Sequence, residues 1–247
     1  MSKSLVAILH YNSIQYTDTL YEILKPYESD IYDLEVIDNG SDLDKTSKYT
    51  TLRLDENLYY GGGLDVTMQY FLENMQYDSM LLLNSDLIVH GYNFVQALRE
   101  ELFATDELVG VSACVMQPEK SQCHWKQNHN WNSKHIRYVP WVDFQCILLK
   151  RKFVEEVRSF NSKFGWVQDV MTGIICKNNN WKIGVCDWIP VIHFGNGSVK
   201  DNSSNPIISK YNQLAEQEMV EYFQHKNLWN QFVEQRLLAE QYEYFKK

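Results

Sequence analysis

The 247-residue sequence predicts an α/β domain with a mostly parallel central sheet flanked by helices, followed by a C-terminal helical extension. Three observations lead to this fold class. The apolar run at 80–83 stops at Asn84-Ser85-Asp86, and a short continuous apolar run is typical of a strand buried on both faces. Strand and helix patterns alternate through the first half, as in parallel βαβ units. From residue 207 onward, apolar residues recur at helical spacing.

The elements of the first half follow one another regularly. Short apolar runs predict strands at 5–9, 34–37, 51–54 and 80–83. Apolar spacing predicts a helix at 14–24, which Pro26 stops, and a second helix at 64–74 after three glycines. This alternation implies right-handed crossovers between parallel strands.

The second half is less regular. We expect helices at 94–103, 153–157 and 167–177, and strands at 109–115, 146–149 and 190–192. Between them, residues 117–137 are polar and rich in Asn, Lys, His and Trp. A loop of this length inside a compact domain is usually functional or disordered.

Composition excludes some classes of protein. Hydrophobic and charged contents of 45% and 22% are ordinary for a globular domain, and the net charge of −9 argues against a surface that wraps nucleic acid. The sequence contains neither an apolar stretch of about 18–20 residues nor the apolar core of a signal peptide, so we expect no membrane insertion and a cytoplasmic protein. Its five cysteines form no CxxC pair, which favours reduced thiols.

Two carboxylates follow predicted buried strands. Ligands of parallel sheets gather at the carboxyl ends of the strands, so Asp86 could hold a divalent cation or a sugar hydroxyl. Its alternative role is to cap the next turn. Asp38 could accept the N3–H of a uracil or thymine ring, or it could cap its own turn. The residues alone leave these two roles of Asp38 even.

Gly61–Gly63 stand directly before the predicted helix. They could let a diphosphate approach the backbone and the helix N-terminus, or they could form only a tight turn. No Gly-Lys-Ser/Thr follows, so this is not a Walker-type phosphate loop.

Taken in order, six motifs from residue 4 to about 200 resemble the family 2 glycosyltransferases of the GT-A (nucleotide-diphospho-sugar transferase) fold, especially the rhamnosyltransferase-like branch. They are Tyr11-Asn12, Ile37-Asp38-Asn39-Gly40-Ser41, Glu56-Asn57-Leu58-Tyr59-Tyr60-Gly61-Gly62-Gly63, Leu82-Leu83-Asn84-Ser85-Asp86, Gln168-Asp169 and Val191-Ile192-His193-Phe194-Gly195-Asn196-Gly197-Ser198. Each motif alone is weak, whereas six in the right order are specific.

The resemblance implies a role for each matched residue. Asp169 would be the general base, and Asp86 and His193 would bind Mn²⁺ or Mg²⁺, with the His nitrogen favouring Mn²⁺. The alternative roles are a helix N-cap or first-turn acid for Asp169 and a hydrogen-bonded structural residue for His193. Contacts to the nucleotide sugar would come from Tyr11, Asp38, Asn57, Gly62, Gly63, Asn84 and Ser85. The sugar or acceptor pocket would involve Trp141, Asp143, Trp166 and Gln168. Trp125, Trp131 and Trp166 could stack on a sugar or a base, or they could fill a core.

The sequence departs from the family pattern at several of these positions. Tyr59 replaces the first glycine, Asn84 replaces a first Asp, and Gln168 replaces the Glu before the base. An acid usual two residues after the base is Met171 here. Asp143-Phe144-Gln145 replaces a small Ser-Gly-Ala run, which implies a reshaped sugar or acceptor pocket.

The expected activity is metal-dependent, inverting sugar transfer from a UDP- or dTDP-linked donor to a hydroxyl of a glycan or lipid-linked saccharide. A hydroxylated nucleic-acid base is a less favoured acceptor, suggested by Lys120, Lys126, Lys134 and Arg137 in the polar loop. A catalytically silent sugar-nucleotide-binding module stays open. His10-Tyr11-Asn12-Ser13 argues against a nucleotidyltransferase, because those enzymes carry a glycine-rich basic loop there.

The same resemblance divides the chain. Residues 1–90 would form the nucleotide-binding half, 91–205 the acceptor and catalytic half, and 206–247 the C-terminal helical extension, through which the protein could form homo-oligomers.

Overall fold

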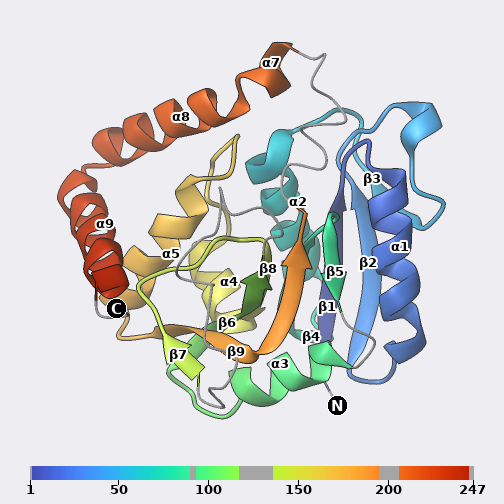
Figure 1. Ribbon diagram of the computed structural model, residues 1–247, viewed down its shortest axis with the longest axis horizontal. Coiled ribbons are helices and arrows are strands. Elements are labelled where there is room, and N and C mark those ends of the chain that lie inside the picture. Colours follow the sequence, from blue (N-terminus) through green and yellow to red (C-terminus); the bar gives the residue numbers. More distant parts are fainter. Residues whose placement is uncertain (1, 90–92, 117–135, 195–205, 245–247) are drawn as a thin grey trace.

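Nine strands form one central sheet in the computed structural model, which describes residues 2–89, 93–116, 136–194 and 206–244 (Figure 1). The strands are β1 Lys3–His10, β2 Tyr32–Asp38, β3 Thr50–Arg53, β4 Tyr77–Asn84, β5 Leu87–Val89, β6 Leu108–Met116, β7 Ile136–Tyr138, β8 Cys146–Lys150 and β9 Lys182–His193. Their order is β3-β2-β1-β4-β8-β6-β9-β5, and β7 also pairs with β9.

The sheet is mixed, which corrects the expectation of a mostly parallel one. The pairs β1–β2, β1–β4, β2–β3 and β6–β9 are parallel. The pairs β4–β8, β5–β9, β6–β8 and β7–β9 are antiparallel. The apolar run of β8 reads like that of a parallel strand because it is buried on both faces, and burial does not encode strand direction.

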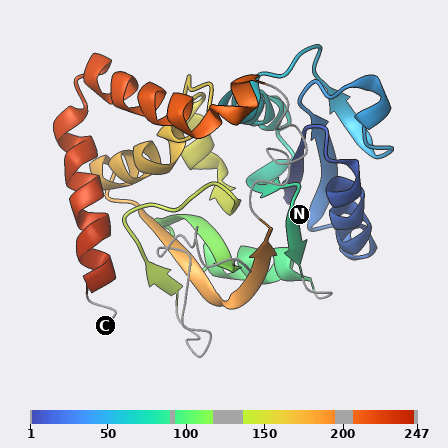
Figure 2. The same ribbon diagram turned by 45° about the horizontal axis from the view of Figure 1, so that its top comes forward.

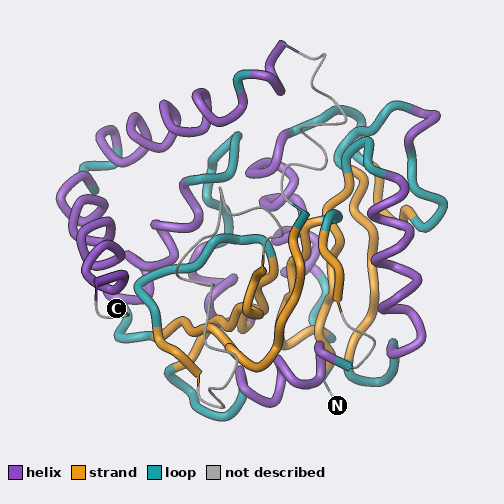
Figure 3. Tube along the Cα trace, viewed as in Figure 1, coloured by secondary structure: helices purple, strands orange, loops and turns teal. Residues whose placement is uncertain are grey.

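Helices cover both faces of the sheet (Figures 2 and 3). They are α1 Ile14–Leu24, α2 Tyr59–Glu73, α3 Phe94–Leu102, α4 Arg151–Val157, α5 Val167–Asn178, α7 Pro206–Ser209, α8 Tyr211–His225 and α9 Trp229–Tyr244, with short 3₁₀ turns at Lys25–Tyr27 and Leu43–Lys45. Every strand and helix predicted from the sequence is present among these elements. The start of α2 differs, because the helix begins at Tyr59 and therefore includes Gly61–Gly63.

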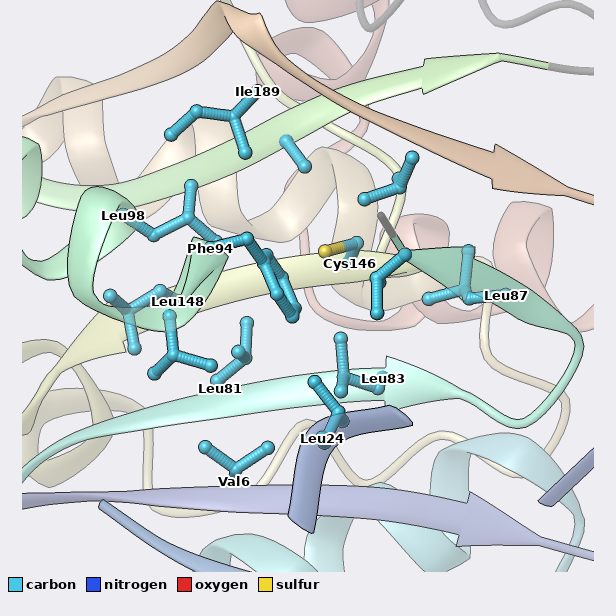
Figure 4. Packing of buried hydrophobic residues seen from close by; sticks show 14 of the residues in the cluster. Val6, Leu24, Leu81, Leu83, Leu87, Phe94, Leu98, Cys146, Leu148 and Ile189 are labelled. Atoms are coloured by element: carbon cyan, nitrogen blue, oxygen red, sulfur yellow. The ribbon is translucent and has the colours of Figure 1, made fainter. Parts of the chain in front are cut away.

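Two hydrophobic clusters fill the space between the sheet and its helices. One packs α1 and α3 against one face and includes Val6, Leu24, Leu81, Phe94 and Leu148 (Figure 4). The other packs α2 and α4 against the opposite face through residues such as Leu64, Phe71 and Phe153. Burial of large side chains at about 25 cal/mol per Å² on both faces fixes the positions of the strand ends.

The C-terminal helices pack on α5 through a third cluster. Its buried members are Trp141, Val167, Val170, Ile174, Met219, Phe223 and Phe232. Trp229, Val233 and Leu237 on α9 are partly exposed, and self-association through them stays a prediction. Among the described residues, no helix combines the length and apolarity needed to cross a membrane.

Candidate functional site

Three polar side chains meet where β4 and β9 end. Asn84 is the last residue of β4, His193 is the last residue of β9, and Asp86 lies between β4 and β5, directly before Leu87. The His193 Nε2 atom lies 3.0 Å from Asp86 Oδ1 and 3.4 Å from Asn84 Nδ2. Pairing of β5 with β9 sets Leu87 opposite His193, which brings the preceding Asp86 beside the imidazole. Asp86 and His193 are each only 6% exposed.

These residues fit a divalent cation. Adjacent ligands of an octahedral ion with bonds of about 2.1 Å lie about 3 Å apart, which is the separation of the His193 and Asp86 atoms. The buried Asn84 Oδ1 has no hydrogen-bond partner in the described structure, and an amide oxygen is a suitable hard ligand. No group of three or more His, Cys, Asp or Glu side chains in the described ranges could hold a metal, so diphosphate oxygens and water would complete the shell.

Asp169 lies in the first turn of α5, where its Oδ1 accepts a hydrogen bond from the Phe144 amide at 3.2 Å. The next carbonyl, that of Gln145, accepts from the Asn84 amide at 2.9 Å. The two residues Phe144 and Gln145 therefore bridge Asp169 to the strand end that carries Asn84. The arrangement brings Asp169 to the same end of the sheet as Asp86.

Tyr60 is a site residue that sequence reasoning missed. Its hydroxyl donates to the Phe144 carbonyl, and burial raises the pKa of that hydroxyl well above its usual value. The negative charges of Asp169, Asp143 and Asp86, together with Tyr211, raise this pKa further. The signal was present in the glycine-rich motif, in which Tyr60 occupies an aromatic position.

Gln168 and Asp143 flank these groups and are buried, at 1% and 7% exposure. The Gln168 amide donates to the Gly165 carbonyl, while its Oε1 has no partner in the described residues. Gln145 also keeps an unpartnered buried Oε1 in that part of the chain. Buried acceptor atoms without donors are uncommon. Among the described residues they also include Thr50 Oγ1 on β3 and Gln235 Oε1 on α9, which lie outside this site.

Asp38 has the contacts of a turn-capping residue. Its Oδ1 accepts from the Ser41 amide at 2.9 Å, and its Oδ2 accepts from Arg53 Nη1 at 2.8 Å. Its side chain has no exposed area. A nucleotide base would reach the carboxylate only if Arg53 or the 38–41 turn moved, so the geometry favours the capping role over the base contact.

The glycines of α2 serve close packing. A Cβ at Gly61 would overlap the backbone carbonyl of Ser162, and one at Gly63 would lie 3.0 Å from both Asn39 Nδ2 and Leu9 Cδ1. Gly62 is crowded only by Leu58, whose Cβ would be 2.7 Å away. Close packing therefore explains why glycine stands at positions 61 and 63, and phosphate binding is not needed to explain it.

The start of α2 keeps a glycine-like backbone without the glycine. Asn57 Oδ1 accepts from the Tyr59 amide at 2.7 Å, and Tyr59 has a φ of 60°. Non-glycine residues rarely adopt this left-handed conformation. Tyr59 thus adopts a conformation that favours glycine, at a steric cost.

The other predicted contacts vary in position. Ser85 lies close to Ser13, with 3.0 Å between their hydroxyls, and Tyr11 is half-buried beside the turn that follows β1. Trp141 is 8% exposed and packs in the cluster between α5 and the C-terminal helices, and its place in a sugar or acceptor pocket stays a prediction. Trp166 is partly buried against the same cluster.

Several predicted contacts lie outside the described residues. They are Lys120, Trp125, Lys126, Trp131, Lys134 and the 195–198 part of the last motif. Arg137 is described, and its guanidinium forms a buried ion pair with Asp187 at 2.9 Å.

Comparison with known proteins supports the fold. No protein-family model and no curated protein matches the sequence. Among solved structures, GalNAc-T7 with UDP, GalNAc and Mn²⁺ matches with a TM-score of 0.62 and 10% identity, over 82% of this chain and 47% of that one. TarS 1–349 from S. aureus matches with a TM-score of 0.57 and 14% identity, over 94% of this chain and 71% of that one. The fold is that of the GT-A glycosyltransferases.

A third match, A197 from STIV, has a TM-score of 0.49 and 15% identity, over 79% of this chain and 87% of that one. This chain spans about half the length of the GalNAc-T7 chain, at 47%. Because these identities are low, the GT-A likeness establishes the fold alone. The family 2 and rhamnosyltransferase-like assignments stay predictions.

Proposed function

We propose that this protein is a metal-dependent, inverting glycosyltransferase that moves a sugar from a nucleotide-diphosphate donor to an acceptor hydroxyl. The observation that carries the proposal is that His193 Nε2, Asp86 Oδ1 and the side-chain amide of Asn84 converge at the end of β4. Asp169 is connected to this strand end by hydrogen bonds through Phe144 and Gln145. Fold alone would not support an activity, because one fold hosts many functions.

Asp86, His193 and the Asn84 oxygen would hold the cation, which would neutralise the charge that develops on the departing diphosphate. Asp169 would take the proton from the acceptor hydroxyl as that oxygen forms a bond to C1 and the bond from C1 to the diphosphate breaks. A positioned general base typically contributes about 10²–10⁴-fold. The Phe144 amide holds one oxygen of Asp169 and leaves the carboxylate orientation defined.

The donor and acceptor classes follow the same reasoning. Mn²⁺ suits the mixed nitrogen and oxygen ligand set slightly better than Mg²⁺. The likeness to GalNAc-T7, whose structure contains UDP and Mn²⁺, supports a uridine or thymidine diphosphate sugar as the donor class. We propose a glycan or lipid-linked saccharide as the acceptor.

A direct test is hydrolysis of uridine and thymidine diphosphate sugars with Mn²⁺, preceded by a thermal-shift screen of the same compounds. A ligand at about 100 times its Kd should add about 2.7 kcal/mol to stability. We expect Mn²⁺-dependent release of the nucleoside diphosphate by the wild type and its loss in Asp86→Ala. Release that persists in Asp86→Ala would contradict the metal role.

A catalytically silent nucleotide-sugar-binding module is the second candidate. It is favoured by Gln168, Met171 and Asn84, which stand where relatives carry acids. A donor-induced thermal shift without turnover, against a panel of saccharide acceptors, would support this module over the enzyme.

A further inference from the structure

The segment 159–165, which joins α4 to α5, is hydrogen-bonded from two sides. On one side, the Asp65 carboxylate of α2 accepts from Ser159 Oγ at 2.6 Å, the Phe160 amide at 2.8 Å and the Asn161 amide at 3.0 Å. One carboxylate thus satisfies three consecutive residues, and charge-assisted hydrogen bonds of this kind are stronger than neutral ones.

On the other side, a single carboxylate from the C-terminal extension holds the next three residues. Glu218 of α8 accepts from Ser162 Oγ at 3.1 Å, the Lys163 amide at 2.6 Å and the Phe164 amide at 2.8 Å. Tyr211, at the start of α8, donates its hydroxyl to the Phe164 carbonyl, and its ring meets the Phe164 ring edge-on at 5.5 Å. Segment 159–165 is therefore fixed to α8 through side chains separated by seven residues.

The same segment contacts the groups around Asp169. The Gly61 amide donates to the Lys163 carbonyl at 3.0 Å. Gly165, with a φ of 89°, packs so closely on the Tyr60 ring that a Cβ would overlap it. Four residues after Gly165, Asp169 lies in the first turn of α5. Displacement of the segment would move both the Tyr60 hydroxyl and the start of α5.

The metal side of the site is held differently. Asn84 and His193 end β4 and β9, and Asp86 directly precedes β5. Strand pairing fixes the register of these strands. Phe144 and Gln145 connect Asn84 to Asp169, but the register of Asn84 comes from the pairing of β4 with β1 and β8, to which α8 does not belong.

We propose that Glu218 is a positioning residue for the transfer reaction: through segment 159–165, α8 holds Asp169 where it meets the acceptor hydroxyl. This inference depends on the proposed function and extends it. It makes the C-terminal helices part of the reaction machinery.

The test compares Glu218→Gln with Glu221→Gln. The first variant keeps the size of the side chain but replaces one carboxylate oxygen with an amide N–H₂. That group cannot accept the hydrogen bonds that segment 159–165 donates to Glu218. The second removes an equal charge from an exposed position on the same helix, where Glu221 accepts only from Gln217 in the described contacts. Turnover of a uridine diphosphate sugar with Mn²⁺ is measured for both, with KM for the donor and the Mn²⁺ concentration at half activity.

We expect Glu218→Gln to lower kcat by about 10–100-fold, because a small misplacement of a reacting group costs that much. The donor KM and the Mn²⁺ midpoint should stay within about twofold of the wild type, and Glu221→Gln should match the wild type throughout. A proportional loss in donor affinity, or an unchanged kcat, would overturn the proposal.

Amide hydrogen exchange gives a readout that does not require turnover. Glu218→Gln should speed exchange in residues 163–172, which include the first turn of α5, and leave β8 at 146–150 unchanged. Faster exchange confined to 163 and 164 would show that α8 does not hold α5, and would overturn the proposal. Tyr211→Phe, which removes only the hydroxyl, should produce the same pattern with a smaller amplitude. If the wild type turns over no nucleotide sugar, the proposed function fails, and the exchange pattern still decides whether α8 holds α5.

Discussion

The strands β2 and β4 flank β1, and each ends in polar residues, yet the two ends differ in how those residues are satisfied. At the end of β2, both oxygens of Asp38 accept from protein donors, namely the Ser41 amide and Arg53. At the end of β4, the Asn84 Oδ1 is buried without a hydrogen-bond partner within the described residues. A buried unpaired acceptor costs about 1–3 kcal/mol.

This difference separates a structural strand end from a candidate ligand site. A carboxylate whose oxygens are all used holds its own loop and adds stability. An acceptor that the protein leaves without a donor lowers stability until a ligand supplies a cation or a proton donor. Position at the carboxyl end of a strand is therefore insufficient to identify a ligand-binding residue, whereas an incomplete set of partners is informative.

The largest expected effect on stability comes from removing the ion pair between Arg53 and Asp38 at the end of β2. Arg53→Met would leave the fully buried Asp38 carboxylate without its charged partner, and loss of one partner of a buried pair costs about 3–5 kcal/mol. Because the Arg53 side chain is 34% exposed, we expect a reduced loss of about 2–3 kcal/mol in chemical denaturation. Lys48→Met, which removes an exposed partner of Glu22, is the matched control and should leave the unfolding midpoint unchanged.

Donor binding sharpens this test. If β2 ends in a structural turn, folded Arg53→Met should bind nucleotide sugars as the wild type does under conditions where both are folded. Donor affinity that falls more than tenfold while the fold persists would instead assign Asp38 and Arg53 to base recognition.

A substitution at the end of β4 should raise the affinity of the candidate metal site for a cation. Asn84→Asp adds a charged oxygen beside Asp86 and His193, and affinity for hard cations rises with the charge of the ligand set. We expect Mn²⁺ to bind on the order of tenfold more tightly, measured by calorimetry, and the metal-free protein to be less stable because two carboxylates become neighbours. Asn93→Asp, which adds the same charge at the N-cap of α3, is the control. Unchanged Mn²⁺ affinity in Asn84→Asp would remove Asn84 from the metal site.

Local patterns predicted most elements of the fold, but not β5, β7 or the 182–189 part of β9. The apolar runs of β1, β2 and β4 and the helical spacing of α1 and α5 each reflect burial, which the sequence encodes residue by residue. Strand direction is not encoded in this way: β8 is buried on both faces and gave no sign that it runs antiparallel to β4. The parallel character of the sheet was overestimated for this reason.

The site was only partly predictable. Asp86 and His193 come from motifs at strand ends, and the sheet brings them to 3.0 Å. Glu218 had no signal, because its importance arises only when α8 packs beside segment 159–165, which precedes it by more than fifty residues. The sequence likewise did not indicate that both oxygens of Asp38 accept hydrogen bonds from the protein, since one of these bonds comes from Arg53 on a neighbouring strand.

The stability of the neighbouring strand end should also depend on pH through His10, the last residue of β1, which lies opposite Asp38 in the sheet. His10 has no exposed area; its Nδ1 pairs with Thr17 at 2.7 Å and its Nε2 with the Lys45 carbonyl at 3.0 Å. A carbonyl only accepts, so Nε2 carries the proton and the neutral ring satisfies both partners. Burial lowers the pKa of His10 below 6.5 despite the opposing effects of the Lys45 carbonyl, Asp38 and Asp18.

Because the unfolded chain binds a proton more readily than the folded one, stability should be complete above about pH 6.5 and fall as the pH drops toward the folded pKa. Each unit of pKa depression is worth about 1.4 kcal/mol. His10→Gln, which keeps a donor and an acceptor but does not titrate, should lose this part of the pH dependence of the unfolding free energy. His225→Gln, at an exposed position, should retain it. A pH profile in His10→Gln identical to the wild type would contradict the neutral buried ring.

The smallest expected effect tests the backbone at the start of α2. This backbone contacts Asn39, in the loop after β2, and Lys163 of segment 159–165. Inside a helix, Ala is more stable than Gly by about 1 kcal/mol. At Tyr59 the φ of 60° reverses that order, because a Cβ is strained in the left-handed region. Tyr59→Gly and Tyr59→Ala both lose the ring contact with Phe164 at 5.1 Å, so their difference isolates the backbone. We expect the Gly variant to be the more stable by about 1 kcal/mol in denaturant titrations. An Ala variant of equal or greater stability would show that Tyr59 does not keep the glycine conformation, and that α2 starts differently from the turn described above.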